Sequence, residues 1–203
     1  MDAEELLQRY AAGERDFSGV NLQWIELRDA NLRGIILVGA NLHSAELVGT
    51  DLEGANLSRA ILDNANMGGV NLVEAILERT NLCEVDLIGA DFSRANLRKA
   101  SLIESGLDGA DLSRADLSSA NLRSAGLDNA VLIEAKLCEA VLVNTVFRGA
   151  DLTEADLSDA NLEGANFSGA NLRGSILDGC FFCQTIMPDG IVRNDHCDEL
   201  YGI

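Results

Sequence analysis

A five-residue repeat runs through this chain from Phe17 to Met187 and never loses its register. Every fifth residue is large and apolar: of 35 such positions, 28 are Leu, five are Phe and two are Met. A small residue stands two places before each of them, and 22 of the 34 small positions are Ala. An α-helix repeats every 3.6 residues and a β-strand every two, so neither explains this period. The chain must bend once in every repeat.

The expected bend lies two places after each large apolar residue. Of these 35 positions 13 are Gly, for example Gly34, Gly39 and Gly49, and several others are Asn, Asp or Ser. Gly adopts positive φ without steric cost, and the three polar residues tolerate turns. Each repeat is therefore predicted to have two inward positions, two residues apart, and three outward positions that include a turn.

Several repeats share the pattern A-(N/D)-L-x-x or a close variant, as in residues 30–34 (ANLRG), 55–59 (ANLSR), 110–114 (ADLSR) and 165–169 (ANFSG). They resemble the units of the pentapeptide-repeat family over 171 of 203 residues. The lead-in YAAGERDF resembles the N-terminal segment of many such proteins from cyanobacteria. The resemblance implies an all-β fold, a right-handed quadrilateral β-helix with four repeats per coil and nearly nine coils. At about 4.8 Å per coil the rod would be about 42 Å long.

Residues 1–16 precede the repeat and are predicted to form an N-terminal helical cap. Asp2 is placed to cap the start of the helix, with Glu5 three residues later, and Gly13 is placed to end it. Its apolar face is expected to carry Leu6, Leu7 and Tyr10. We expect this face, with Trp24, to cover the first coil, since an open sheet edge invites association. A partner-binding amphipathic helix is the alternative.

Residues 17–187 are predicted to form one β-helix, because no loop or linker interrupts the repeat. Residues 188–203 are predicted to form a C-terminal tail, which begins with the turn signal Pro188-Asp189-Gly190. Its apolar residues are Ile191, Val192, Leu200, Tyr201 and Ile203. The tail either covers the last coil or joins two molecules end to end, so the protein is expected to be a monomer or an end-to-end dimer.

The net charge of −18 argues against direct binding of nucleic acid or of an anionic membrane surface. No apolar run approaches the roughly 18 residues of a transmembrane helix. The acidic start of the chain lacks the features of a signal peptide. Five Cys at irregular spacing do not resemble a disulfide framework. These features predict a reducing, cytoplasmic location.

No catalytic residue, cofactor or metal site is predicted. Cys180-x-x-Cys183 resembles half of a metal or redox motif, but the register turns Cys180 inward and Cys183 outward. His43 is outward and isolated, and His196 lies in the tail. No Ser or Cys has a His and a carboxylate placed to activate it, and no phosphate-binding loop is present. The chain is therefore not expected to be an enzyme.

The residue before each large apolar one is usually Asn or Asp, which predicts a hydrogen-bonded ladder along the axis. One column of this ladder forms a candidate acidic face of Asp51, Asp91, Asp111 and Asp151. Asp91 and Asp111 would lie one coil apart, where two like charges cost stability or hold a cation. Arg94 and Arg114, three residues further on, are expected to neutralise them.

Apolar residues at outward positions form a candidate protein-contact set: Ile103, Val131, Ile133, Val141, Val143 and Val146. On a four-sided rod Ile103, Val141 and Val143 share one side with Cys83. Exposed apolar patches often mark contacts, although single β-branched residues also simply favour extended backbone. The main hypothesis is therefore a rigid, non-enzymatic module that binds an unidentified protein.

The alternative hypothesis is a DNA mimic, because the resemblance includes family members that copy the shape and charge of duplex DNA and bind DNA gyrase. Residues 1–16 and 188–203 each carry a net charge of −3, which leaves −12 for the rod. That is one charge per roughly 3.5 Å, whereas duplex DNA has one per about 1.7 Å. This lower charge density favours the first hypothesis. The resemblance also implies that members that confer resistance typically have loops that break the coils or a dimerising C-terminal module, and neither is evident in this sequence.

Overall fold

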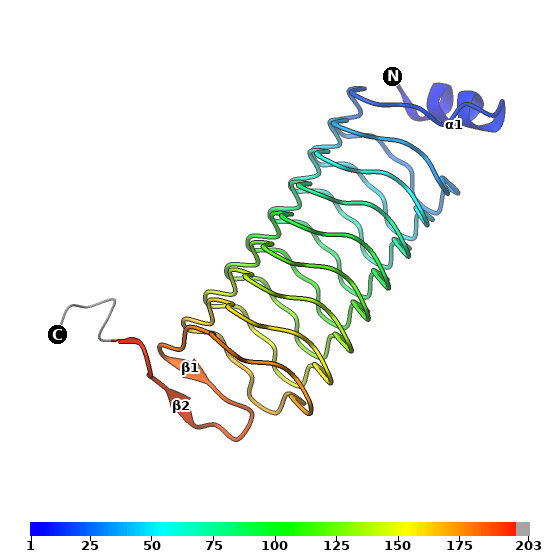
Figure 1. Ribbon diagram of the computed structural model, residues 1–203. Helices are drawn as coiled ribbons and strands as arrows, with labels where there is room; N and C mark the ends of the chain where they lie inside the picture. Colours follow the sequence, from blue (N-terminus) through cyan, green and yellow to red (C-terminus); the bar gives the residue numbers. More distant parts are fainter. Residues whose placement is uncertain (198–203) are drawn as a thin grey trace.

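The computed structural model describes residues 1–197, which form a rod of stacked coils with one helix at its N-terminal end (Figure 1). The helix, α1, spans Ala3–Ala11. At the other end, β1 (Thr185–Ile186) and β2 (Val192–Arg193) form a two-stranded antiparallel sheet. Within the described residues, no helix is both long and apolar enough to span a bilayer.

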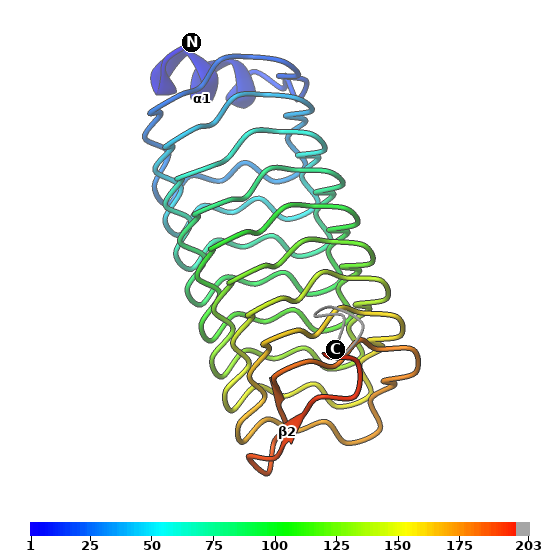
Figure 2. The ribbon, with the colours of Figure 1, turned by 90° about the vertical axis from the view of Figure 1, so that its left-hand side faces the viewer.

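The rod is a set of parallel ladders between residues 20 positions apart, from Asp16 with Ile36 to Asn166 with Ile186. Four repeats therefore make one coil, and successive coils lie on top of one another along one axis (Figure 2). The backbone bonds of the rod run between coils: Leu37 N donates to Asn56 O at 2.7 Å, and Asn56 N donates to Ile35 O at 2.9 Å. The prediction of four repeats per coil is confirmed.

Each repeat closes with a tight turn at the predicted position. In one example Ala40 N donates to Leu37 O at 3.0 Å, and Gly39 has a φ of 63°. Positive φ at the third residue of a turn favours Gly or Asn. Many repeats place a charged residue there instead, such as Glu104 with a φ of 57°. The turns thus form four corners along the rod, and their side chains project into solvent.

The interior is narrow and filled almost entirely by the two predicted inward columns. Ala and Leu from every coil are buried, and Phe147 and Phe167 stack with ring centroids 4.8 Å apart. Some coils place Thr at the small position, where burial of a hydroxyl is costly unless it is bonded. Thr50 Oγ1 donates to Leu27 O at 2.7 Å, and the other inward Thr hydroxyls do the same.

The helix covers the first coil with fewer side chains than expected. Asp2 Oδ1 accepts from Glu5 N at 2.9 Å, as the predicted cap requires. Leu6 is fully buried, and the Tyr10 hydroxyl donates to Arg33 O at 2.8 Å. Leu7, however, is 39% exposed. Leu6 and Tyr10 are four residues apart and share the helix face that meets the first coil, whereas Leu7, the next residue after Leu6, points away from that face.

The tail doubles back against the last coil. Thr185 pairs with Arg193 and Ile186 with Val192, and His196 N donates to Phe182 O at 3.0 Å. The Arg193 guanidinium lies 3.5 Å from the centroid of the Phe182 ring, which is almost fully buried. The described part of the tail therefore covers two sides of the last coil. Leu200, Tyr201 and Ile203 lie outside the described residues.

A disulfide joins Cys183 to Cys197, 14 residues apart. The expectation that the cysteines form no disulfide is wrong for this pair. The turn after Met187 reverses the chain and brings the tail alongside Cys183, which no count of Cys spacing could show. Cys180 points inward as predicted, with its thiol 3.0 Å from Leu157 O.

Candidate functional site

The acidic column lies on the side of the rod that contains residues 91–94 and their equivalents in other coils, here called the Asp91 side. Asp91 and Asp111 are ladder neighbours, as predicted. Their carboxylates bond locally: Asp91 Oδ1 accepts from Ser93 N, and Asp111 Oδ1 accepts from Ser113 N, both at 2.8 Å. Residues 1–197 contain no group of three or more His, Cys, Asp or Glu side chains arranged to hold a metal ion.

The expected neutralisation of these aspartates is wrong. Arg94 Nε donates to Glu74 at 2.9 Å, and Arg114 donates to Glu134 at 2.9 and 3.0 Å. All four side chains project from the same corner, so each Arg meets the Glu one coil away before it meets an Asp on the flat side. An acid and a base that are neighbours along this corner thus pair within the chain.

The Asn and Asp ladder is mainly local rather than axial. In most repeats the side-chain oxygen accepts from the backbone N–H two residues on, as Asn41 Oδ1 does from His43 N at 3.1 Å. Axial bonds are fewer, for example Asn71 Nδ2 to Asp51 Oδ1 at 2.9 Å and Asn171 Nδ2 to Asp151 Oδ1 at 3.1 Å. The column therefore stabilises the turns more than it joins the coils.

The turn that contains Asp151 and Thr153 leads to a prediction about the pH dependence of stability. Thr153 donates to Asp151 Oδ1 through its hydroxyl at 2.5 Å and its backbone N–H at 3.0 Å, which lowers the pKa of Asp151. A lowered folded-state pKa contributes stability above the unfolded value of about 3.9, and this is lost as the pH falls through the folded value. Thr153→Val should raise the pKa of Asp151, as followed by NMR titration.

The same substitution should cost about 1 kcal/mol or less at pH 6, because Asp151 is partly exposed. The difference in melting temperature from wild type should shrink as the pH falls through the folded-state pKa of Asp151, because protonation of the carboxyl removes the contribution of these hydrogen bonds to the pH dependence. Thr153→Ser keeps the hydroxyl and serves as the control. An unchanged Asp151 titration in Thr153→Val would contradict the assigned cause.

His43 is not isolated, contrary to expectation. Its Nδ1 lies 2.8 Å from Asp63 Oδ2 in the next coil, and its Nε2 lies 3.2 Å from Ser44 Oγ. The Trp24 ring meets the imidazole edge to face, with centroids 5.4 Å apart. His43 and Asp63 are 20 residues apart, so the 20-residue coil was the signal that could have predicted their contact.

The backbone N–H groups beside this Ser, His and Asp arrangement are already bonded. A tetrahedral intermediate needs free N–H donors beside the nucleophile. The backbone N–H groups of His43, Ser44 and Ala45 all have acceptors: Asn41 Oδ1, Asp63 O and Leu42 O. The cluster therefore binds neighbouring coils to each other, and none of these three N–H groups is free to bind an oxyanion.

The predicted contact residues are less exposed than the sequence suggested. Val143 is only 4% exposed, which corrects its assignment as an exposed contact residue. It lies in one column between the long side chains of Arg123 and Glu163, and coils about 4.8 Å apart leave a short side chain covered. The other members of the set are half-buried: Ile103, Val131, Ile133, Val141 and Val146.

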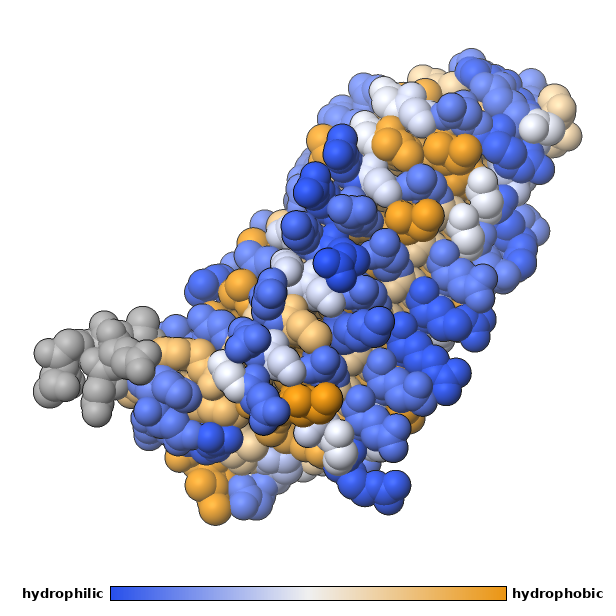
Figure 3. Space-filling model, in the orientation of Figure 1, coloured by the Kyte–Doolittle hydropathy of each residue, from blue (hydrophilic) through white to orange (hydrophobic). Residues whose placement is uncertain are grey.

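Other apolar side chains of the rod itself are more exposed, namely Trp24 at 68%, Ile88 at 55%, Ile176 at 44%, Ile61 at 42% and Ile76 at 39%. In the view of Figure 3 apolar side chains appear as separate groups among hydrophilic ones, over several coils of the rod. On this face the rod therefore offers several small, separate apolar anchors.

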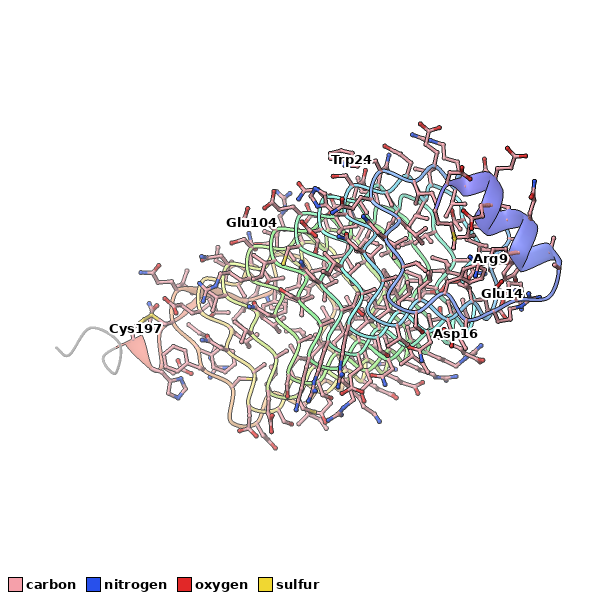
Figure 4. The ribbon with its side chains drawn as sticks, turned by 90° about the horizontal axis from the view of Figure 1, so that it is seen from above. Arg9, Glu14, Asp16, Trp24, Glu104 and Cys197 are labelled. Carbon is pink, nitrogen blue, oxygen red and sulfur yellow. A yellow bond between two sulfur atoms is a disulfide. The ribbon has the colours of Figure 1, made fainter. Side chains whose placement is uncertain are left out.

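Trp24 is the most exposed large apolar residue in the described part of the chain. It does not cover the first coil as expected, because it occupies a corner turn with a φ of 61° and projects outward (Figure 4). Beside it, the start of α1 and the first coil form a small hollow lined by Met1, Asp2, Ala3, Gln23, Trp24, Ile25 and Glu26.

The free cysteines do not form a reactive or metal-binding group. Burial raises the pKa of the Cys180 thiol to about 11, and burial with the nearby Asp156 does the same for Cys138. Thiols with such pKa values are protonated at neutral pH and are poor nucleophiles. Cys83 lies on another side, with its sulfur 3.0 Å from Ser101 Oγ.

Comparison with known proteins is consistent with this geometry. The family model for pentapeptide repeats matches in eight copies, over ranges that run from residues 16–54 to residues 165–189. No curated protein sequence matches. Among solved structures, HetL from the cyanobacterium Nostoc sp., a pentapeptide repeat protein involved in heterocyst differentiation regulation, is 36% identical. The alignment covers 95% of this chain and 100% of HetL, with a TM-score of 0.56.

Trypsin-treated QnrB1, a plasmid-mediated fluoroquinolone resistance protein, is 19% identical; the match covers 79% of this chain and 87% of QnrB1, with a TM-score of 0.61. That likeness concerns the fold alone. The family match spans nearly the whole repeat region, and the known structures of the family are right-handed β-helices. This chain belongs to the pentapeptide-repeat family.

Proposed function

We propose that this protein is a rigid, non-enzymatic scaffold that acts by binding another protein. The observation that carries the proposal is the 68% exposure of Trp24 at a corner of the first coil. Trp is enriched among the residues that dominate binding energy, and its exposure in an unbound protein is costly. The likeness to HetL, which is involved in the regulation of heterocyst differentiation, supports a regulatory role for this binding.

Replacement of Trp24 separates binding from folding. Trp24→Asn should leave the melting temperature unchanged or slightly higher, because Asn tolerates the left-handed φ of 61° better than Trp does. It should remove the partner from affinity capture with quantitative mass spectrometry, since loss of a central Trp often costs 2 kcal/mol or more, about 30-fold in affinity.

Ser124→Asn is the matched control, because Ser124 occupies an equivalent exposed corner position with a φ of 57°. Proteins captured by wild type and by Ser124→Asn but lost with Trp24→Asn are the expected partners. If all three baits retain the same proteins in the same amounts, Trp24 is not a binding residue.

The alternative function is DNA mimicry, which the acidic net charge of −18 and the fold shared with QnrB1 favour. Charged ion pairs along the rod, such as Arg114 with Glu134, weaken this likeness to a uniformly anionic duplex. A gyrase supercoiling assay tests it directly. If micromolar protein neither inhibits gyrase nor protects it from quinolones, the alternative is rejected.

A cytoplasmic location is part of the proposal. The Cys183–Cys197 disulfide bears on it, because disulfides persist mainly in oxidising compartments. In a reducing cytoplasm these two residues would be thiols for most of the time, and the tail would be held by its hydrogen bonds and by the contact between Arg193 and Phe182.

A further inference from the structure

Over its third to fifth coils, charges are segregated on one side of the rod, the side that contains residues 81–84 and their equivalents in other coils, here called the Cys83 side. Its first corner carries Arg59, Arg79 and Lys99 in three successive coils, here called the basic edge, and carries Glu139 and Asp159 further towards the C-terminus. Its second corner carries Glu84 and Glu104 in successive coils, here called the acidic edge. Trp24 and Glu104 project from the same margin of the rod (Figure 4).

These charges lack the pairing seen on the other corner. Within residues 1–197, Arg59, Lys99, Glu84 and Glu104 form no ion pair, and Arg79 meets only its sequence neighbour Glu78, at 3.7 Å. All five side chains of the two edges are exposed. Like charges stacked about 4.8 Å apart repel each other. An arrangement that costs stability within one chain suggests that opposite charges reach it from another.

The floor between the two edges carries one charged residue over the same coils, Asp63. Ile61 is 42% exposed, and the positions that follow along the side are Asn81, Cys83, Ser101 and Ile103. The Asp63 carboxylate at the N-terminal end of this floor is already bonded to His43. A partner that fits must therefore bring one acidic edge, one basic edge and a neutral centre.

We propose that this partner is a second copy of the same chain, docked side by side and parallel. A two-fold axis that runs along the rod between two Cys83 sides exchanges their edges and keeps every coil at its own level. Arg79 then faces Glu84 of the second copy, and Lys99 faces Glu104. This interface goes beyond the proposed Trp24 contact, because its charged pairs lie in the fourth and fifth coils, whereas Trp24 lies on the same corner three coils nearer the N-terminus.

The same symmetry matches the remaining coils. It places Asn81 opposite Cys83 of the second copy, Ser101 opposite Ile103, Asn121 opposite Arg123 and Val141 opposite Val143. No like charges meet from the fourth coil to the eighth. A two-fold axis across the rod would instead set one basic edge against the other, so the parallel arrangement is the favoured one.

The contact is narrow, because each side of the rod is one pentapeptide wide. Interfaces below about 1,200 Å² in total are typically transient, so we expect a dissociation constant of about 100 µM. The exposed edges are screened by salt, with a Debye length of about 3 Å at 1 M. Self-association should therefore weaken several-fold between 50 mM and 1 M NaCl.

Charge reversal tests the proposal by sedimentation equilibrium of the full-length protein up to about 500 µM. Arg79→Glu/Lys99→Glu makes both edges acidic in the fourth and fifth coils, and Glu84→Lys/Glu104→Lys makes both edges basic there, so each variant alone should stay monomeric. A 1:1 mixture of the two should dimerise as tightly as wild type, since opposite edges meet again. Lys136→Glu/Arg173→Glu, on other sides of the rod, changes net charge as the first variant does and should still dimerise.

Cross-linking tests the register. Asn81→Cys should be joined by a short bismaleimide to the native Cys83 of the second copy, to give a covalent dimer at about 100 µM protein. Asn121→Cys, which would face Arg123, should give at least about tenfold less dimer. A wild-type protein that stays monomeric at every concentration, a charge-reversal mixture that stays monomeric, or equal cross-linking of both Cys variants would overturn the proposal.

Discussion

Leu97→Asp should unfold the centre of the rod. Leu97 is fully buried in the inward column, between Leu77 and Leu117 of the neighbouring coils. A carboxylate there loses its water and gains no partner, which costs several kcal/mol. Because each coil of a solenoid contacts only its neighbours, the loss also breaks the continuity of the core. Thermal unfolding followed by circular dichroism should show a large fall in melting temperature.

Asn96→Asp is the matched control for this prediction. It adds the same carboxylate one residue earlier, at an outward position where Asp111 and Asp116 already occur in nearby repeats. Asn96 Oδ1 accepts from Arg98 N at 3.1 Å, and an Asp oxygen accepts equally well. The free energy of unfolding of the control should lie within about 0.5 kcal/mol of that of wild type. Equal melting of Leu97→Asp and wild type would contradict the inward assignment.

Cys197→Ser should loosen the C-terminal end. The disulfide closes a segment of 14 residues, and a loop of that length contributes about 3 kcal/mol in the chain-entropy model. Its loss should free the tail and expose Phe182, while the middle coils keep their structure. Hydrogen exchange should therefore show faster exchange at the amides of Phe182 and Gln184, which bond to His196 and Asn194.

Cys138→Ser is the control, because Cys138 is a half-buried free thiol outside the tail. Its exchange pattern at the last coil should equal that of wild type under oxidising conditions. Wild type treated with a dithiol reductant should behave like Cys197→Ser. Identical protection of Phe182 in oxidised wild type and in Cys197→Ser would show that the disulfide does not stabilise this end.

The repeat made the coil predictable. A period of five with Leu and Ala at fixed positions specifies which side chains are buried, and Gly39 and its equivalents mark where the backbone needs positive φ. The resemblance to the family then supplied four repeats per coil, from which residues 20 apart become neighbours. That rule would also have predicted the contact of His43 with Asp63.

Surface chemistry was harder to predict, because it depends on which of several neighbours a long side chain reaches. Arg94 was expected to neutralise Asp91 and bonds to Glu74 instead. Val143 was expected to be exposed and is covered, although its position in the repeat is outward. Both outcomes depend on side chains one coil above and below, at distances that only the stacked coils define.

The sequence by itself determined the rod: its period, its inward columns and its turns, because these follow from local geometry repeated without interruption. Only the tertiary structure decided the ends and the surface. It brought Cys183 to Cys197, left Trp24 in solvent and set Arg79 and Lys99 on the opposite edge from Glu84 and Glu104. The physical reason is that these contacts involve residues outside the repeat or in neighbouring coils. For such residues the five-residue period fixes a position on the rod, but it does not determine which side chain is contacted.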